Sequence, residues 1–177
     1  ECLKLRQSGR CGRKSTVAGG VDQTEMETME CTVSWTGPSG TRSGMGFVAE
    51  TGSGHMLMMD GAPDAARPEN GGQNLAPRPM ETVLAGTGGC TAYDVVLILR
   101  RGRHDVRGCT VTLTSERAET DPKVFLKIHM QFTVTGKGIP AAAVERAIAM
   151  SHEKYCSASI MLGKTAAITT GFTLVEA

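Results

Sequence analysis

The stretch that decides the fold runs from Pro79 to Gly102 and reads Pro-Met-Glu-Thr-Val-Leu-Ala-Gly-Thr-Gly-Gly-Cys-Thr-Ala-Tyr-Asp-Val-Val-Leu-Ile-Leu-Arg-Arg-Gly. Proline suits the first turn of a helix and glycine its end, so the stretch predicts one long helix. Its residues are apolar on nearly every side. A helix of that kind is usually buried at the centre of a domain or between two subunits. Cys90 lies inside it, so we expect a buried site there.

Three glycines precede this cysteine closely, at positions 86, 88 and 89. Each costs a helix roughly 1 kcal/mol relative to alanine, so something must offset them. The glycines would let another backbone pack against the helix, or would leave space around the Cys90 sulfur for a substrate or a second thiol. The plainer alternative is that Cys90 is a small buried hydrophobic residue beside a tight helix crossing.

The patterns on both sides of this helix predict an α+β domain. Residue alternation and turn formers indicate strands, and a period near four indicates helices. The two long alternating runs are joined by a turn-like linker, which favours an antiparallel hairpin. The predicted elements are strands at 31–35, 46–48 and 55–59, strands at 106–118 and 124–135, a helix at 140–152, a short helical piece after Cys156, and a closing strand at 167–175.

The bulk composition fits one compact domain with a small-molecule partner. The chain has 177 residues, a net charge of +1 and 40% hydrophobic residues. It has neither the basic excess of a nucleic-acid binder nor the low hydrophobicity of a disordered chain. Glycines and Asp94 interrupt the longest apolar run, so we expect no membrane-spanning segment. Together these features favour a soluble protein.

The chain contains six cysteines, and no two have the spacing of a CxxC motif. A chain this long and this rich in aliphatic residues does not need disulfides to fold, so we expect free thiols and a reducing, cytoplasmic compartment. Cysteine stands at positions 2, 11, 31, 90, 109 and 156.

The first 29 residues differ from the rest, because a basic segment free of acidic residues is followed by an acidic one. We expect an N-terminal extension at 1–29 and a single domain at 30–177. A flexible extension, upstream translated sequence and an organelle transit peptide all fit such a start.

Cys156 follows the predicted helix at 140–152 and precedes a further short one. Free backbone N–H groups at a helix start, together with Lys154, would favour its thiolate form. Cys156 is therefore a candidate reactive thiol. Capping residues such as Ser157 and Ser159 are common in turns, so the position alone is a weak signal.

Several motifs in a fixed order resemble the OsmC/Ohr superfamily, in the branch that bears the sequence GGCTAYD. The resemblance covers about residues 31–176. The motifs are Arg78-Pro-Met-Glu81, Gly88-Gly-Cys-Thr-Ala-Tyr-Asp94, Glu116-Arg-Ala-Glu119, Pro122-Lys-Val-Phe125, Glu153-Lys-Tyr-Cys-Ser-Ala-Ser159 and Met161-Leu-Gly-Lys-Thr165.

The resemblance implies an OsmC-like α+β fold, in which an antiparallel sheet wraps a long central helix and two chains intertwine as a homodimer. It implies that Cys90 attacks the O–O bond of a hydroperoxide and becomes a sulfenic acid, and that Cys156 resolves it as a disulfide. A thiol donor or a lipoyl protein would restore the dithiol. No cofactor and no metal are implied.

The family also activates its first cysteine with an arginine that a glutamate holds in place. Arg78 and Glu81 are the nearest candidates, at helical spacing i,i+3. Aligned from Cys90, however, the family glutamate falls on Met80. On one unbroken helix Glu81 would point about 180° away from Cys90, because nine residues make two and a half turns. Glu81 would then pair with Arg78 on the surface instead.

Other polar residues are expected to play structural parts. A charged Asp94, one turn from Cys90, would oppose thiolate formation, which favours a structural or dimer-contact role. The four histidines lack metal-type spacing with the cysteines. They stand at positions 55, 104, 129 and 152.

Three functions remain open at this stage. The first is a cofactor-free thiol peroxidase that acts on organic or inorganic hydroperoxides. The second is a redox sensor or small-ligand binder that keeps the fold with little turnover, which Met80 at the usual glutamate position favours. The third is a scaffold with inert thiols, which predicts that the sulfurs of Cys90 and Cys156 lie too far apart to bridge.

Overall fold

The computed structural model describes residues 28–37 and 44–177. Cys31–Ala177 forms one compact unit. The expected extension at 1–29, with Cys2 and Cys11, lies almost wholly outside the described residues.

The first sheet contains three antiparallel strands in the order β1-β2-β3. The strands are β1 (Cys31–Trp35), β2 (Phe47–Thr51) and β3 (Met56–Met59). β2 and β3 are joined by a tight turn in which Gly54 has a φ of +81° and its N–H bonds to the Thr51 carbonyl at 2.9 Å. That left-handed conformation suits glycine, which has no Cβ. The three predicted strands are confirmed: β1 has the predicted bounds, and the bounds of β2 and β3 agree within three residues.

The loop after β3 is organised around one buried carboxylate, that of Asp60. Its two oxygens accept backbone N–H bonds from Gly61 at 2.7 Å, Gln73 at 3.0 Å and Leu75 at 2.9 Å. These donors, Leu75 foremost, lower the pKa of Asp60. A single turn of 3₁₀ helix, Pro68–Asn70, lies within the loop. The loop therefore enters the long helix along a defined path.

The long helix α1 spans Pro79–Arg101, as the sequence predicts, and Gly102 caps its end. One side of α1 is buried, and we call it the inner face. It consists of Thr87, Gly88, Thr91, Val95 and Leu99. The opposite side we call the outer face, and it consists of Gly89, Ala92, Tyr93, Val96, Leu97 and Arg100.

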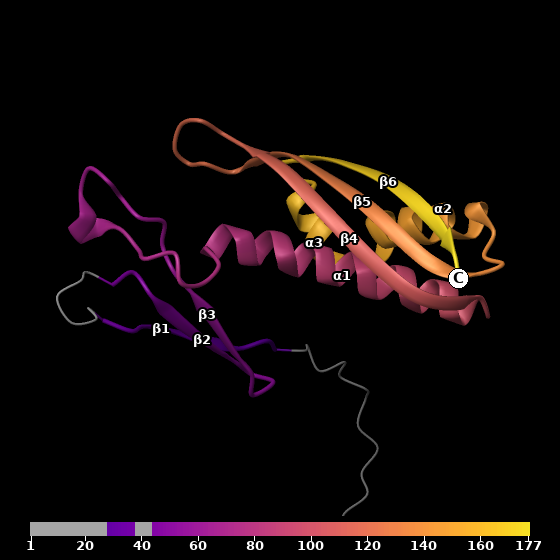
Figure 1. The fold of residues 1–177 in the computed structure, drawn as a ribbon, viewed down its shortest axis with the longest axis horizontal. Coiled ribbons are helices and arrows are strands. Elements are labelled where there is room, and N and C mark those ends of the chain that lie inside the picture. Colours follow the sequence, from indigo (N-terminus) through magenta and orange to yellow (C-terminus); the bar gives the residue numbers. More distant parts are fainter. Residues whose placement is uncertain (1–27, 38–43) are drawn as a thin grey trace, which may run out of the picture. The chain divides into compact units, whose positions relative to one another are not determined.

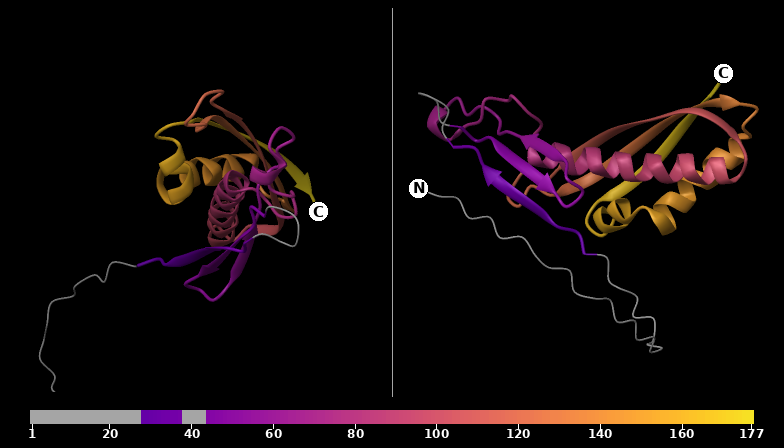
Figure 2. Two further views of the ribbon diagram at one scale, coloured as in Figure 1. Left: turned by 90° about the vertical axis from the view of Figure 1, so that its left-hand side faces the viewer. Right: turned by 90° about the horizontal axis from the view of Figure 1, so that it is seen from below.

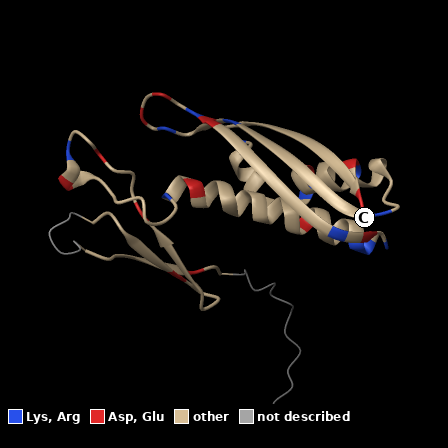
Figure 3. Cartoon of the chain, in the orientation of Figure 1, with Lys and Arg blue, Asp and Glu red and all other residues tan. Residues whose placement is uncertain are grey.

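The sequence predicts no membrane-spanning segment, and α1 is the helix that bears on this expectation. Its mean hydropathy over 18 residues is 1.5, so by length and composition alone it could cross a membrane despite its glycines and Asp94. Figure 3 shows its other charges only near the two ends. The buried core helices of soluble proteins often have the same length and apolar composition. Because the inner face packs against the second sheet and two further helices, we assign α1 as a core helix.

The second sheet contains β4 (Asp105–Arg117), β5 (Phe125–Lys137) and β6 (Ala167–Glu176), in that order. β4 and β5 form the expected antiparallel hairpin. β6, however, runs parallel to β5, so this sheet is mixed where the sequence analysis expected antiparallel pairing throughout. A parallel neighbour requires a long crossover connection, and the helices between β5 and β6 supply it (Figure 1).

The crossover consists of α2 (Ala141–Met150), a π-helical turn (Ser151–Tyr155) and α3 (Ser157–Leu162). The sequence predicts one helix from residue 140 to residue 152. Instead, the backbone widens into the π turn, in which the Cys156 N–H bonds to the Ser151 carbonyl at 2.8 Å. Such turns are rare and frequently mark functional sites. This one places Ser151 and Cys156 beside α1.

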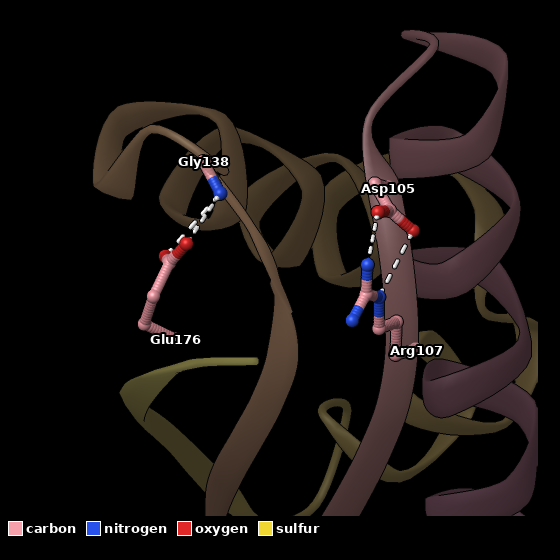
Figure 4. Close-up of polar contacts among 4 residues, drawn as sticks. All are labelled: Asp105, Arg107, Gly138 and Glu176. Carbon is pink, nitrogen blue, oxygen red and sulfur yellow. Dashed lines mark hydrogen bonds and ion pairs between the residues drawn. The ribbon is translucent and has the colours of Figure 1, made fainter.

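The helices cover one face of the second sheet, and the core lies between them (Figures 1 and 2). Alternate residues of β5 supply its centre, and Phe132 and Val134 have no exposed surface. At one end of the sheet the Glu176 carboxylate accepts the Gly138 N–H at 3.1 Å, and Arg107 pairs with Asp105 at 2.9 Å (Figure 4). The Glu176 contact ties the end of β6 to the residue after β5, whereas the exposed Arg107–Asp105 pair lies within β4.

Candidate redox-active thiol site

The two cysteines singled out in the sequence meet in the fold. The sulfur atoms of Cys90 and Cys156 and a carboxylate oxygen of Asp94 all lie within 4.8 Å of one another. Both cysteines are free thiols. The wide separation predicted for an inert scaffold is therefore not found, although an S–S bond of about 2.05 Å requires the sulfurs to approach by up to about 2.8 Å. Cys90 and Asp94 come from successive turns of α1, and Cys156 comes from the crossover.

Cys156 is fully buried at the start of α3. Its sulfur accepts the Ser159 backbone N–H at 3.4 Å, while the Ser159 hydroxyl donates to the Cys156 carbonyl at 3.1 Å. Backbone N–H groups are expected at the start of a helix, and the Ser159 N–H is one of them. Lys154 was expected to favour the Cys156 thiolate. Its ammonium group instead lies over the Tyr155 ring, 5.3 Å from the ring centre. The two hydrogen bonds with Ser159 therefore hold the Cys156 sulfur in one orientation.

A short chain of hydrogen bonds holds Asp94. The Ser151 hydroxyl donates to the Asp94 carboxylate at 3.0 Å, and the Thr91 and Ser151 hydroxyls lie 3.0 Å apart. Because Ser151 gives its proton to Asp94, Thr91 is the donor in the second bond. Thr91 and Ser151 are both buried, so the carboxylate is fixed in orientation by groups that have no competing water.

The surroundings of Cys90 disfavour its thiolate. Burial is the largest cause that raises its pKa above the ordinary 9.0, followed by the hydrogen bond with Cys156. The negative charges of Cys156 and Asp94 raise it further, and only the Ala158 backbone N–H lowers it. The expected opposition from Asp94 is thus present. No cation acts on Cys90 within the part of the chain that the structure describes.

Arg78 and Glu81 lie at the exposed entry of α1, away from the cysteines. Glu81 accepts the Arg78 backbone N–H at 2.9 Å and so caps the helix. Since α1 is unbroken and rises 1.5 Å per residue, Arg78 stands about 18 Å along the axis from Cys90. An arginine side chain cannot span that length. Within one chain, therefore, Arg78 does not reach the thiol.

The three glycines before Cys90 have different surroundings. A Cβ on Gly88 would lie 2.6 Å from the Leu113 side chain of β4, whereas a Cβ on Gly86 or Gly89 would meet nothing within 4 Å. Gly88 thus leaves room for the Leu113 side chain. Among the described residues, neither another backbone nor a second thiol occupies this space, contrary to one expectation for the glycines before Cys90. The helix cost of Gly86 and Gly89 is not offset by contacts within the described chain.

A shallow apolar pocket of about 520 Å³ lies along the outer face of α1. It is bordered by Cys109 of β4 as well as by the outer-face residues. Tyr93 there is 69% exposed. Apolar pockets with few polar groups commonly receive a ligand or a partner.

Ser151 and Thr91 were not among the site residues predicted from the sequence. Their only signal is spacing, since Thr91 and Asp94 lie three residues apart on one helix face. Ser151 acquires its place from the π turn, which no local pattern marks. Among the described residues, no histidine joins the cysteine cluster. The Nδ1 atom of His152 is buried without a hydrogen-bond partner.

Comparisons with known proteins find relatives over most of this chain. The family model for OsmC-like proteins matches residues 71–171. Protein YhfA of Escherichia coli K12 is 45% identical over 149 residues, which are 84% of this chain and 100% of YhfA. A solved structure described as structural genomics is 42% identical, with a TM-score of 0.70, over 84% of this chain and 100% of that one.

A structure from Legionella pneumophila, described as an organic hydroperoxide resistance protein OsmC, is 19% identical with a TM-score of 0.56. It covers 84% of this chain and 98% of its own, and it shares the fold. The family model and the extended match to YhfA together decide the assignment. This chain belongs to the OsmC family.

Proposed function

We propose that the protein is a thiol-dependent peroxidase that reduces organic or inorganic hydroperoxides, with Cys90 as the attacking thiol and Cys156 as the resolving one. The observation that carries the proposal is the placement of both sulfurs within 4.8 Å. The name of the Legionella relative, an organic hydroperoxide resistance protein, gives the same chemical class.

The reaction consists of two balanced steps. The Cys90 thiolate attacks the outer oxygen of the hydroperoxide, the O–O bond breaks, and the alkoxide takes a proton to leave as alcohol. The Cys90 sulfenic acid then meets the Cys156 thiol, an S–S bond forms, and water leaves. The dithiol has lost two electrons. Two external thiols, or one dihydrolipoyl group on a protein, return them and restore both cysteines.

A cation is the missing part of the mechanism, since burial and two neighbouring acidic groups oppose the Cys90 thiolate. Arg78 is our candidate, but the helix length requires that it come from a second copy of the chain. Glu81 would orient that arginine. Neither role needs a cofactor or a metal.

A homodimer would also explain the apolar surfaces that this chain leaves open. One face of the first sheet carries Val33, Trp35, Phe47, Ala49 and Leu57, since opposite residues in the register share a face. Val33 is 53% and Trp35 56% exposed. Exposed apolar patches of this kind mark interaction sites. A second copy that covers this face and the outer face of α1 would also bury Gly86 and Gly89.

Replacement of Cys90 by serine tests the proposal. We expect Cys90→Ser to abolish hydroperoxide consumption in the presence of a dithiol reductant, and Cys156→Ser to stop at the sulfenic acid after one oxidation. Cys109→Ser is the matched control and should turn over normally. Peptide mass spectrometry of the oxidised wild type should find Cys90 joined to Cys156. Undiminished turnover by Cys90→Ser would refute the proposal.

The second candidate function is a redox sensor, and the raised pKa of Cys90 favours it. A sensor oxidises once and waits, whereas a peroxidase cycles. Rate constants with hydrogen peroxide and an alkyl hydroperoxide separate the two. Fast, reductant-dependent turnover supports the enzyme, and a single slow oxidation supports the sensor.

A further inference from the structure

We propose that Cys90, Asp94 and Cys156 in their reduced state form a binding site for a divalent metal ion that prefers sulfur ligands, with Zn²⁺ the best fit. The proposal rests on ligand type and position. Two cysteine sulfurs and one carboxylate oxygen converge within 4.8 Å. This is the donor set that zinc takes in proteins, with three protein ligands and one open position in the sites that exchange ligands.

The distances suit a zinc ion after a small adjustment. Zinc bonds to sulfur at about 2.3 Å and to oxygen at about 2.0–2.2 Å, so two ligand atoms in a tetrahedron lie roughly 3.5–3.8 Å apart. The present upper bound of 4.8 Å leaves about 1 Å to close, which side-chain rotation supplies. Cys90 and Asp94 share one side of α1 at spacing i,i+4, so both approach the ion together.

The groups behind the ligands already have the arrangement of an outer coordination shell. Ser151 donates to one oxygen of Asp94 at 3.0 Å, which leaves the other oxygen for the ion. The Ser159 N–H points at the Cys156 sulfur at 3.4 Å. Such partners orient the ligands of a metal site and contribute to its affinity. Here they are present before any ion binds.

Charge points the same way. Once a bound ion has displaced both thiol protons, the two thiolates and the carboxylate would carry three negative charges together. The two ion pairs found among the described residues, Arg107 with Asp105 and Lys127 with Glu116, do not involve this cluster. A divalent ion would neutralise two of the three charges, and a coordinated thiol loses its proton outright. Cys90 is only half-buried, so part of its side chain can be reached from solvent.

One consequence depends on the proposed peroxidase chemistry. When a hydroperoxide joins the two sulfurs, the thiolates give two electrons to the O–O bond, which takes up two protons to form alcohol and water. The disulfide retains no thiolate ligand, so the ion leaves. Metal binding by the dithiol does not itself depend on that chemistry.

Titration of the reduced full-length chain with Co²⁺, a spectroscopic substitute for Zn²⁺, tests the inference. Cys2 and Cys11 are first replaced by serine, so that only thiols of the described part respond. We expect one ion per chain, with thiolate-to-cobalt absorption in the near ultraviolet that Zn²⁺ displaces. Absence of that absorption in the parent chain would overturn the proposal, whatever the variants do.

Variants in the same background assign the ligands. Cys90→Ser and Cys156→Ser should each lose the thiolate absorption, and Asp94→Asn should weaken binding at least tenfold. Ser151→Ala should weaken it by about 10- to 100-fold, as for other outer-shell groups. Cys109→Ser, the control thiol, should bind like the parent. Equal losses in Cys109→Ser and Cys90→Ser would overturn the assignment.

Peroxide turnover of the chelator-treated protein keeps the two proposals distinct. Turnover without cobalt absorption removes the metal site and leaves the peroxidase intact. Cobalt absorption that follows the expected variant pattern supports the site, even if turnover is absent and the proposed function falls. With both present, a hydroperoxide should release Zn²⁺ in step with disulfide formation.

Discussion

The inner and outer faces of α1 belong to one helix but have opposite surroundings. The inner face is closed by the second sheet and the crossover, and its hydroxyls at Thr87 and Thr91 have hydrogen-bond partners. The outer face is as apolar, yet it borders an open pocket, and Tyr93 is largely exposed. Within the described chain, therefore, packing closes the inner face of this helix and leaves the outer face partly open. Cys90 lies at the boundary between the two faces.

The largest test of this contrast is a pair of truncations, one on each face. Leu99→Ala on the inner face should cost about 2–5 kcal/mol of unfolding free energy, because it leaves a cavity in a closed core. Tyr93→Ala on the outer face should change the stability of the dilute chain by less than about 0.5 kcal/mol. Denaturant unfolding followed by circular dichroism measures both.

Sedimentation of the same pair sharpens the contrast. Tyr93→Ala should weaken self-association, whereas Leu99→Ala should not act on it directly. Equal losses of stability from the two truncations in dilute solution would show that the outer face is closed within one chain.

The next effect concerns the polar part of the inner face. Ser151→Ala should cost about 1–3 kcal/mol, because it leaves the buried Thr91 hydroxyl and the half-buried Asp94 carboxylate each short of one hydrogen bond. Ser157→Ala, at an exposed position of α3, is the matched control and should be nearly neutral. Thermal unfolding of the two variants compares them. A neutral Ser151→Ala would mean that water replaces the hydroxyl.

A smaller effect separates two glycines that lie two residues apart. Gly86→Ala should stabilise the dilute chain by up to about 1 kcal/mol, because alanine favours helix and its Cβ meets open space. Gly88→Ala should destabilise it, since Leu113 must move. Denaturant midpoints with unchanged slopes give both signs. A destabilising Gly86→Ala that also weakens self-association would place a second chain over that position.

The smallest effect is electrostatic and concerns Cys90, which lies at the boundary between the inner and outer faces of α1. Asp94 is the last of the causes that raise the pKa of Cys90, so Asp94→Asn should lower that pKa. The thiolate would then form at lower pH, and the pH profile of Cys90 alkylation should move in the acid direction. Cys109, whose pKa is raised by burial alone, is the internal control. Peptide-level mass spectrometry of alkylated protein at neutral to alkaline pH follows both thiols, and a profile that moves for both would exclude a local charge effect.

Local patterns predicted the elements well and their mutual arrangement less well. Pro79 and Gly102 marked the ends of α1, and period-two alternation marked β4 and β5, because these signals act between near neighbours. The parallel direction of β6 depends on the whole crossover, so no pattern within residues 167–176 carries it. The π turn at residue 151 likewise has no local signature.

The candidate site divides in the same way. Motif resemblance brought Cys90 and Cys156 together across 66 positions, and the structure places their sulfurs side by side. Ser151 was missed because its importance comes from burial against α1, which spacing along α2 does not reveal. Arg78 was judged by its position in sequence, and only the length of an unbroken helix shows that its own Cys90 lies out of reach.

The position of Cys156 in the crossover also decides when, during synthesis of the chain, the two thiols can first meet. Cys156 follows Cys90 by 66 residues, so α1 and the β4–β5 hairpin leave the ribosome before the second sulfur does. A nascent chain therefore cannot lock itself in this disulfide early. In the finished protein, the bond would enclose β4 and β5 in a covalent loop and restrain the unfolded chain by roughly 4 kcal/mol, so oxidation would make the protein harder to unfold.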